Sequence, residues 1–413
     1  MQYELHTGNS LIELKKLKDN SVDSVITDPP YELGFMGKEW DKSGIANNVE
    51  LWKEVLRVLK PGGHLLSFGG TRTYHRMVCA IEDAGFQIRD QIAWIYGSGF
   101  PKSNDIGKMI DKAAGATRIK TGDPRPVPNQ AVVNQHFSKV DGDYCIKNSK
   151  IKCTDKRMEY YDTKPATAEA KIWNGWGTGL KPAMEPIVVA RKPLSESTII
   201  KNVIKYGTGA INIDASRIPT TDKFGGGKKG SSGFAAGYND EGWEPGSDKG
   251  RWPANVITDG SDEVVAMFPD SNGAGGSIPK VKVTGYGNKN VGTGTYEYIP
   301  NHRISINSGS GSAARFFYCA KANKSDRDTG NTHPTVKPTE LMRHLVRMVT
   351  PKGGLVLDPF LGSGSTGKAC MLEGMRFIGI DLSPEYVKIA TSRIEKAKAE
   401  YDDEHKIDEF VSD

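Results

Sequence analysis

The chain has 413 residues, 37% of them hydrophobic and 25% charged, and a formal net charge of +5. This length allows two or three domains, or one large domain with insertions. No run of about 18 apolar residues and no basic-then-apolar N-terminus is present, which argues against a membrane span or a secretory signal and predicts a cytoplasmic protein. The five cysteines form no C-x-x-C pair, so neither a metal site nor a disulfide framework is expected.

The first hundred residues alternate between strand-like and helix-like segments. Strands are expected over residues 22–27, 64–70 and 87–97, and helices over 48–60 and 71–86. Such alternation is typical of a parallel sheet with crossover helices, and it predicts the α/β class.

The stretch TDPPYELGF, residues 27–35, follows the first of these strands. Pro29 and Pro30 lack backbone N–H donors and have a fixed φ, so the strand ends there. Asp28 and Tyr31 are therefore expected on a rigid turn at the carboxyl end of a strand, where open α/β sheets bind ligands. An ordinary strand-ending turn explains an isolated D-P-P-Y equally well.

The middle of the chain is less regular. Residues 101–165 contain 13 Lys and Arg against 8 Asp and Glu, a surplus that suits a polyanion-binding face but also an ordinary solvated surface. Residues 186–190 are expected to form one more strand. Residues 221–312 hold 19 of the 47 glycines, which predicts long loops, and long irregular segments in a compact domain are usually functional.

Regular structure is expected again from residue 315. Residues 315–321 fit a strand and 335–350 a helix, and 353–394 then fit strand, Gly-rich turn, helix, strand, turn and helix. The charged tail that follows residue 395 is expected to fray.

The Gly-rich turn has a G-x-G-x-x-G pattern, Gly362, Gly364 and Gly367, between a strand and a helix. Such a loop lets backbone N–H groups approach a ligand, and Asp381, at the end of the next strand, suits ribose hydroxyls. A dinucleotide is the commonest ligand of this pattern. Asp358, at the tip of the preceding strand, instead favours a cationic group, and S-adenosylmethionine has both a ribose and a sulfonium with an ammonium.

The chain resembles the permuted beta type of site-specific DNA amino-methyltransferases in two motifs. These are TDPPYELGF and, after a long middle segment, LDPFLGSGSTG. In that family the catalytic half, with its DPPY motif, precedes the cofactor-binding motif. The family's remaining cofactor motif resembles NTHPTVKPTELMRHLV. The segment that usually precedes the catalytic tetrapeptide in the family is similar to LHTGNSLIELKKLKDNSVDSVITDPPY. Asn9 stands where an aspartate is common. The resemblance covers residues 1–100 and 315–395, and WGTGLKPAMEPIVVARKP.

The resemblance implies a Rossmann-like methyltransferase fold dependent on S-adenosylmethionine, a mostly parallel, doubly wound sheet with irregular inserted target-recognition regions. Residues 221–250 are expected to order on DNA binding. The implied domain order is a catalytic half (1–100), a basic DNA-recognition insertion (101–170), a return segment (171–214), a Gly-rich target-recognition insertion (215–314), a cofactor-binding half (315–395) and a charged tail (396–413).

The implied reaction is methyl transfer from S-adenosylmethionine to the N6 amino group of an adenine in DNA. Asp28 and the Pro29 carbonyl are expected to accept the amino protons, with Asp28 as general base, and Pro29 and Pro30 to hold these acceptors in place. Tyr31 is expected to stack on the base, which must be flipped out of the duplex.

The resemblance also implies which residues bind the cofactor. Asp358 would face the methionine amino group, with room left by the glycines, and Asp381 would hold the ribose. Thr335 and Lys337 would reach the methionine carboxylate, although Lys337 is also an ordinary residue for a helix start. The full set is Asn9, Thr335, Lys337, Asp358, Pro359, Phe360, Gly362, Gly364, Thr366 and Asp381.

Double-stranded DNA is the expected partner, with phosphate contacts from the basic insertion. Trp173 and Trp176 would line the base pocket or intercalate, but packing in the interior is the favoured interpretation. Phe35 and Trp40 would shape the base pocket or, equally, belong to the core. The phosphate-contact candidates are Lys102, Lys112, Arg118, Lys120, Lys152, Lys156 and Arg157.

Other functions are weighed against this one. A cytosine-N4 enzyme would use the same acceptors, but aspartate rather than serine at position 28 favours adenine within the family. An NAD-dependent oxidoreductase would use the glycine loop and leaves TDPPY unexplained. An inert DNA-binding protein would need neither site, and the size of the middle region disfavours RNA or a free nucleotide. The family also has homodimers and cognate restriction enzymes as partners, for which the sequence carries no signal.

Overall fold

The computed structural model describes residues 2–34, 39–99, 103–125, 137–140, 143–146, 160–220, 227–228, 243–244, 249–271, 311–321 and 323–411. The chain forms two compact units. Unit 1 comprises Met1–Ser98 and Ala183–Asp413, and unit 2 comprises Gly99–Pro182. Residues 171–182, expected in the return segment, therefore belong to unit 2.

Unit 1 is built on a nine-stranded sheet with the order β1-β17-β16-β2-β3-β9-β4-β12-β15. Neighbouring strands run parallel except at β9, which is antiparallel to both β3 and β4. This confirms the expected α/β class and mostly parallel sheet. The strands are β1 (Tyr3–Thr7), β2 (Val22–Thr27), β3 (Leu59–Phe68), β4 (Gln87–Ile95), β9 (Met184–Arg191), β12 (Val256–Thr258), β15 (Tyr318–Cys319), β16 (Leu355–Asp358) and β17 (Arg376–Asp381).

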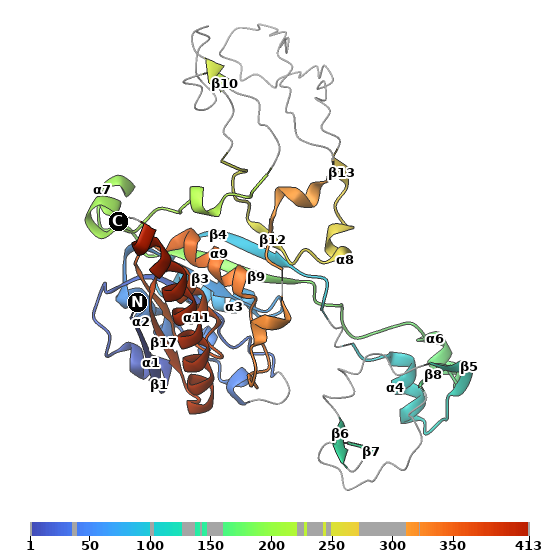
Figure 1. The fold of residues 1–413 in the computed structure, drawn as a ribbon. Coiled ribbons are helices and arrows are strands. Elements are labelled where there is room, and N and C mark those ends of the chain that lie inside the picture. Colours follow the sequence, from blue (N-terminus) through green and yellow to red (C-terminus); the bar gives the residue numbers. More distant parts are fainter. Residues whose placement is uncertain are drawn as a thin grey trace, which may run out of the picture. The chain divides into compact units, whose positions relative to one another are not determined.

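The two ends of the chain interleave within this sheet (Figure 1). β17 pairs with β1 on one side, and β16 pairs with β2 on the other, so two C-terminal strands lie between two N-terminal ones. The N-terminal and C-terminal halves therefore form one domain, although long insertions separate them in the sequence.

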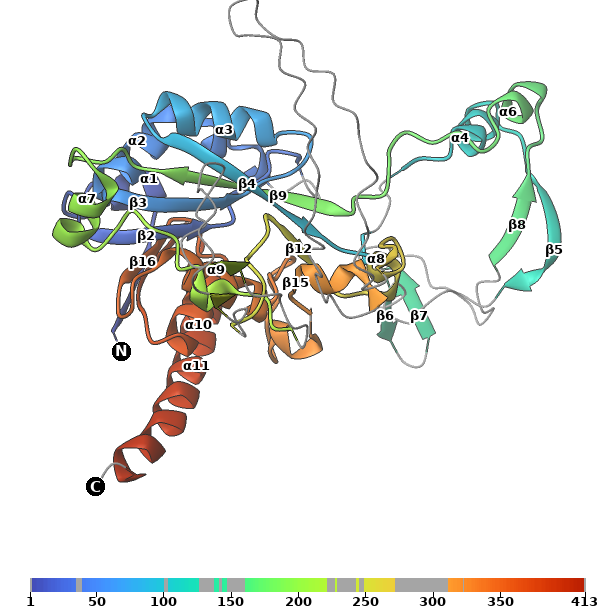
Figure 2. The same cartoon turned by 90° about the horizontal axis from the view of Figure 1, so that it is seen from above.

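Helices cover both faces of the sheet (Figure 2). Val25 and Leu65 belong to the hydrophobic core on one face, together with Trp52, whereas Ile26 and Leu66 belong to the core on the other face. Successive strand residues point to opposite faces, so β2 and β3 are apolar on both. One layer consists of α1 (Ser10–Leu14), α2 (Val49–Val58) and α3 (Tyr74–Asp83), and the other of α9 (Thr339–Val349), α10 (Ser365–Leu372) and α11 (Pro384–Val411).

Unit 1 also contains shorter elements. The helix α7 (Ile199–Tyr206) packs beside β3, and α8 (Asp262–Val265) follows β12. The Gly-rich segment contributes β10 (Gly227–Lys228) paired with β11 (Trp243–Glu244), and β13 (Asp270–Ser271) paired with β14 (Gly311–Ser312). Most of the segment 221–312, including most of 221–250, lies outside the described residues.

Unit 2 contains more regular structure than its composition predicts. Its buried Asp111 accepts hydrogen bonds from Arg118 Nη1 at 2.7 Å and from the backbone and hydroxyl of Thr167. This contact fastens the end of α4 to the start of α6. The elements of unit 2 are α4 (Ile106–Ala113), β5 (Ile119–Arg125) paired with β8 (Tyr160–Lys164), β6 (Phe137–Val140) paired with β7 (Asp143–Ile146), and α6 (Ala168–Ile172).

Three expectations about local structure are wrong. The charged tail does not fray at residue 395, because α11 continues to Val411. The strand expected at 315–321 is reduced to β15, since Ala313–Phe316 forms a 3-10 turn. Trp173 and Trp176 are 43% and 60% exposed, with their rings in edge contact at 5.1 Å, rather than packed in the interior.

None of the helices in the described part of the chain is long and apolar enough to cross a membrane.

The packing of α10 against α11 predicts that Gly364→Ala is strongly destabilising. Gly364 has φ +79°, and an added Cβ would lie 2.9 Å from Ala390 Cα. Gly353 has φ +69° with open space around it, so Gly353→Ala measures the cost of the backbone conformation alone, about 1–2 kcal/mol. Overpacking should add about 1–3 kcal/mol at position 364. Urea unfolding of both variants tests this, and equal losses would contradict it.

Candidate active site

The carboxyl ends of β2, β16 and β17 lie at the same edge of the sheet because these strands run parallel. Asp28 follows β2, Asp358 ends β16 and Asp381 ends β17. The D-P-P-Y turn and the Gly-rich turn, far apart in the sequence, therefore lie side by side. This edge is where doubly wound sheets bind their ligands.

Asp28 has one oxygen in an ion pair and one oxygen without a partner. Its Oδ2 lies 2.6 Å from the Lys337 ammonium. Its Oδ1 is buried and accepts no hydrogen bond from any residue that the structure describes. A buried acceptor without a donor is costly, and such groups in native proteins commonly have a functional role.

Tyr31 is held at both its backbone and its phenol. Its carbonyl accepts a hydrogen bond from Thr73 Oγ1 at 2.6 Å, and its hydroxyl donates to Glu185 Oε2 at 2.9 Å. Its ring lies against Gly70, where an added Cβ would come within 3.1 Å of it. Burial, followed by the charges of Asp28 and Glu185, raises the pKa of Tyr31 well above its ordinary value, so the phenol stays neutral.

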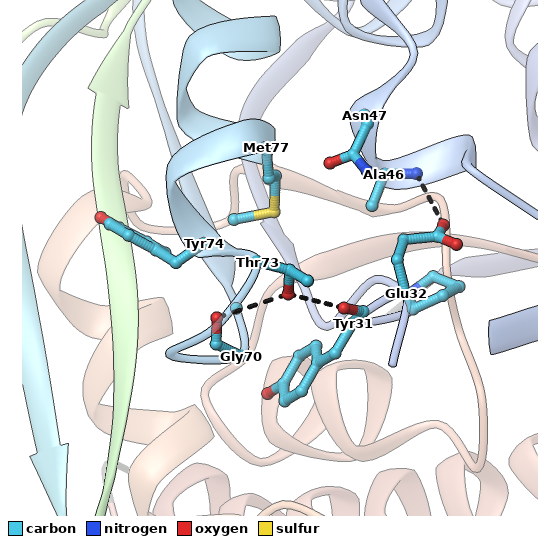
Figure 3. A pocket seen from close by; sticks show the side chains of 10 residues that line it. Tyr31, Glu32, Ala46, Asn47, Gly70, Thr73, Tyr74 and Met77 are labelled. Carbon is cyan, nitrogen blue, oxygen red and sulfur yellow. Dashed lines mark hydrogen bonds between the residues drawn. The ribbon is translucent and has the colours of Figure 1, made fainter. Parts of the chain in front are cut away.

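A hollow lies beside the Tyr31 ring (Figure 3). The Glu32 backbone is left-handed, with φ 55°, and its carboxylate accepts a hydrogen bond from the Gly44 amide at 2.8 Å. This contact ties the D-P-P-Y turn to the segment before α2. The residues that line the hollow are Pro30, Tyr31, Glu32, Ala46, Asn47, Gly69, Gly70, Thr73, Tyr74 and Met77.

Asp358 is enclosed rather than open to a ligand, with 2% of its surface exposed. Its Oδ1 accepts hydrogen bonds from the Thr27 hydroxyl at 2.6 Å and from the Phe360 amide at 3.0 Å. Its Oδ2 accepts one from the Thr366 hydroxyl at 2.6 Å. Burial raises the pKa of Asp358 to about 6 against the opposing effect of these donors. The carboxylate expected to face a cofactor ammonium thus links β2, β16 and α10.

Asp381 keeps capacity for a ligand. Its two oxygens each accept one backbone amide, from Gly362 at 2.8 Å and from Ser383 at 2.8 Å. Because a carboxylate oxygen has two lone pairs, hydroxyl donors can still be accommodated. Burial raises the pKa of Asp381.

His333 and Asn331 border the glycine loop, and the sequence analysis assigned neither. His333 Nδ1 lies 2.6 Å from the Thr335 carbonyl, and its Nε2 would be 3.2 Å from a Cβ at Gly362. Burial lowers the pKa of His333, so the ring is neutral at neutral pH. Asn331 Nδ2 is buried and has no partner among the described residues.

The remaining expected cofactor residues lie near the same sheet edge or in the segments that lead to it. Asn9 caps α1 by accepting the Leu11 amide at 3.0 Å. Thr335 is exposed, whereas Lys337 is buried at Asp28 and Glu185. Pro359 and Phe360 follow Asp358 in the turn, and the Pro359 carbonyl accepts a hydrogen bond from the Ser10 hydroxyl at 2.6 Å.

The residues expected to contact DNA phosphates differ in their exposure and in their partners. Arg118 donates hydrogen bonds to Asp111 and Thr163 inside unit 2, so its guanidinium stabilises the fold of that unit. Lys112 and Lys120 are exposed in unit 2. The candidates Lys102, Lys152, Lys156 and Arg157, as well as Phe35 and the side chain of Trp40, lie outside the described residues.

Glu185 is the main site residue that the sequence analysis missed. It lies in β9, where its carboxylate contacts the phenol of Tyr31, the ammonium of Lys337 and, at 3.5 Å, the hydroxyl of Tyr96. The available signal was a single acid at the start of the apolar run PIVVA, in a segment already recognised as a strand.

The two turns at the sheet edge fall within one family match. The profile of the DNA methylase family, which includes N6 and N4 methyltransferases, matches residues 22–392. The chain belongs to this family.

Curated relatives of this DNA methylase are mostly matched over part of their length. M.HindIII of Haemophilus influenzae, a type II methyltransferase, is 22% identical over 97% of this chain and 99% of its own length. M2.DpnII of Streptococcus pneumoniae, also type II, is 49% identical over 15% of this chain and 24% of that protein. The DNA adenine methyltransferase YhdJ of Escherichia coli is 39% identical over 17% of this chain and 24% of its own.

Solved structures of DNA methyltransferases also resemble the chain. The PvuII DNA methyltransferase, described as cytosine-N4-specific, has a TM-score of 0.43 at 16% identity, over 97% of this chain and 92% of that one. M1.HpyAVI in complex with S-adenosylmethionine has a TM-score of 0.37 at 14% identity, over 95% and 100% of the two chains.

The environment of Asp358 predicts a pH-dependent effect of Asp358→Asn on stability. With a pKa of about 6 when folded and an ordinary value of 3.8, the carboxyl contributes stability that is present below pH 4 and lost as the pH rises through 6. The loss amounts to about 3 kcal/mol. The isosteric amide does not titrate, so the variant should gain stability relative to the wild type between pH 4 and 7.

Thermal unfolding of both proteins across this pH range measures the difference. Asp83→Asn, at the exposed end of α3, is the matched control for replacing a carboxylate with an amide. A stability difference for Asp358→Asn that does not change with pH would contradict the raised pKa.

Proposed function

We propose that the protein is a DNA methyltransferase of the permuted beta type that transfers a methyl group from S-adenosylmethionine to N6 of a flipped-out adenine. The observation that carries this proposal is the buried, unpartnered Oδ1 of Asp28 beside the Tyr31 ring, at the same sheet edge as the Gly-rich turn. An acceptor next to an aromatic face is what an exocyclic amino group on a planar base requires.

The residues around the Gly-rich turn fit S-adenosylmethionine in their chemistry. Asp381 would accept the ribose hydroxyls, since each of its oxygens has capacity left. A side chain at position 362 would press against His333, so the glycine leaves room there for a ligand. The buried amide nitrogen of Asn331, which has no partner among the described residues, offers a hydrogen-bond donor. The cofactor supplies an electrophilic methyl group on a sulfonium.

Asp28 and the Pro29 carbonyl would accept hydrogen bonds from the two amino protons of the target base. The nitrogen lone pair, otherwise delocalised into the ring, is then directed toward the methyl carbon. The cofactor would supply its methyl group to this nitrogen, and Asp28 Oδ1 would take up the surplus proton and pass it to water. Pro29 and Pro30 fix both acceptors beforehand, which lowers the entropic part of the barrier.

Tyr31 would stack on the flipped base. Unpairing and unstacking a base costs a few kcal/mol, and contact with an aromatic ring offsets part of this cost. The neutral phenol, held by Glu185, keeps the ring in one orientation. The expected roles of Phe35 and Trp40 in the same pocket remain a proposal.

Unit 2 and the Gly-rich insertion would bind double-stranded DNA. Lys112 and Lys120 would position the duplex through its phosphates. The exposed Trp173 and Trp176 would contact bases or sugars, since two neighbouring indole rings in solvent are unusual without a partner. A second copy of the chain and a cognate restriction enzyme are further partners that the family suggests.

Adenine is the proposed base because aspartate opens the D-P-P-Y tetrapeptide, and a matched relative, YhdJ, is named a DNA adenine methyltransferase. Incubation with S-adenosylmethionine and unmethylated bacterial DNA, followed by mass spectrometry of the nucleosides, tests this choice. N6-methyladenine is expected. Detection of N4-methylcytosine would be consistent with the proposed mechanism but would contradict adenine as the target base.

The proposal predicts that Asp28→Asn slows methyl transfer strongly with little effect on cofactor binding. The amide keeps the shape but cannot take up the proton, so the single-turnover rate should fall about 10²- to 10⁴-fold. Transfer of a tritiated methyl group to DNA measures the rate, and calorimetry measures cofactor affinity. Asp83→Asn is again the control. Retained methylation in Asp28→Asn would contradict the proposed role.

A further inference from the structure

We propose that Lys337 and Glu185 form a positioning pair that holds the Asp28 carboxylate and the Tyr31 ring in place for methyl transfer. This inference rests on the proposed function and adds two residues to it. It also gives Lys337 a role at the catalytic turn in place of the cofactor-carboxylate contact expected from the sequence.

The Lys337 ammonium has three acceptors for its three protons. Nζ lies 2.6 Å from Asp28 Oδ2, 3.2 Å from Glu185 Oε2 and 3.2 Å from the Tyr31 hydroxyl. The side chain is only 9% exposed. Because Lys337 occupies Oδ2 alone, the carboxylate is oriented with Oδ1 left over as the acceptor.

The aromatic rings around the ammonium strengthen this placement. Nζ lies 4.8 Å from the ring centroid of Phe68 and 5.4 Å from that of Tyr31. Both distances lie within the range of cation–π attraction. Phe68 ends β3, so the ammonium is enclosed by residues from two neighbouring strands as well as by its own segment before α9.

Glu185 connects the ammonium to the stacking ring. Its Oε2 accepts the Tyr31 hydroxyl at 2.9 Å and also faces Lys337, while its Oε1 lies 3.5 Å from the Tyr96 hydroxyl. β9 is the first strand after unit 2, and it lies between β3 and β4. The strand that returns from the insertion thus supplies the carboxylate that holds the ring.

The charges of the cluster explain why Lys337 is suited to this place. Burial by itself lowers the pKa of Lys337, but the charges of Asp28 and Glu185 outweigh it and leave the pKa raised. The ammonium is therefore a fixed cation throughout the working pH range. Its charge balances one of the two carboxylates. An ammonium nitrogen has no lone pair, so Lys337 cannot accept the proton that Asp28 takes up.

Moving Lys337 to a cofactor carboxylate would leave Asp28 and Glu185 without their shared cation in a partly buried site. Two neighbouring carboxylates without a counter-ion are strongly unfavourable. Other groups that face Asp28 are the neutral His333 and the buried Asp358, and neither supplies a replacement charge.

The test compares Lys337→Met, Glu185→Gln and the double variant with the wild-type chain. Lys53→Met, in an exposed ion pair on α2, is the matched control for loss of a lysine. Single-turnover methyl transfer to DNA at saturating cofactor is measured across pH, and S-adenosylmethionine affinity is measured by calorimetry. Thermal unfolding verifies that each variant is folded.

We expect each single variant to lose at least about 10-fold in rate, since a small misplacement of reacting groups costs up to about 100-fold. Cofactor affinity should change less than about threefold. The double variant should lose little more than the worse single variant, because both act on the same groups. In Lys337→Met the acid limb of the pH–rate profile should move to higher pH, because the two carboxylates then retain a proton more readily.

Two results would overturn the inference while leaving the proposed function intact. One is a Lys337→Met protein that transfers methyl groups at the wild-type rate when cofactor is saturating but binds S-adenosylmethionine at least about tenfold more weakly. The other is a pH–rate profile of Lys337→Met that matches the wild type, together with a double variant whose loss in rate equals the combined losses of the two single variants. A wild-type chain that binds cofactor and methylates no DNA would instead remove the proposed function, and the inference with it.

If Lys337→Met does not fold, Tyr31→Phe provides the test. This variant keeps the stacking ring and removes only the hydroxyl that contacts both Glu185 and Lys337. A loss of about 10-fold in rate, the equivalent of one charge-assisted hydrogen bond, is expected. An unchanged rate would overturn the inference.

Discussion

The buried carboxylate of Asp358 is the contact on which the site depends. It accepts the hydroxyl of Thr27, which is 331 residues away in the sequence and directly precedes Asp28. It also accepts the hydroxyl of Thr366 at the start of α10. Burying a carboxylate is unfavourable unless its lone pairs are satisfied, and three donors from the domain's two halves satisfy them. The catalytic turn and the Gly-rich turn are thereby held in a fixed relation.

The interleaved sheet makes this contact available. β16 and β17 lie between β1 and β2, so the loops that follow them open at the same edge as the D-P-P-Y turn. The segment before α9 then brings Lys337 back across this edge to Asp28, 309 residues away in the sequence. The five strands at the centre of the sheet are β16, β2, β3, β9 and β4, and none of them belongs to the basic insertion or to the Gly-rich insertion. Unit 2 is accordingly a separate compact body joined to the sheet through β4 and β9.

Much of the fold and part of the site could be predicted from the sequence. Pro29 and Pro30 mark the end of β2, and the glycines mark the start of α10, because these residues act locally on the backbone. The partners of Asp358 and Lys337 could not be predicted, since they depend on which strands become neighbours. Glu185 was missed for the same reason: its role exists only because β9 inserts next to β3. The burial of Trp173 and Trp176 was predicted wrongly, because composition does not reveal which apolar side chains a small unit leaves exposed.

The most direct test of this account is a photo-crosslink between the enzyme and its target base. A duplex carrying 5-iodouracil at the target position, once the methylated site is mapped, is irradiated with the enzyme and a cofactor analogue, and the crosslinked peptide is identified by mass spectrometry. The account predicts attachment at Tyr31, because the flipped base lies on its ring. Crosslinks only to residues outside the D-P-P-Y turn, from a protein that methylates DNA, would contradict it.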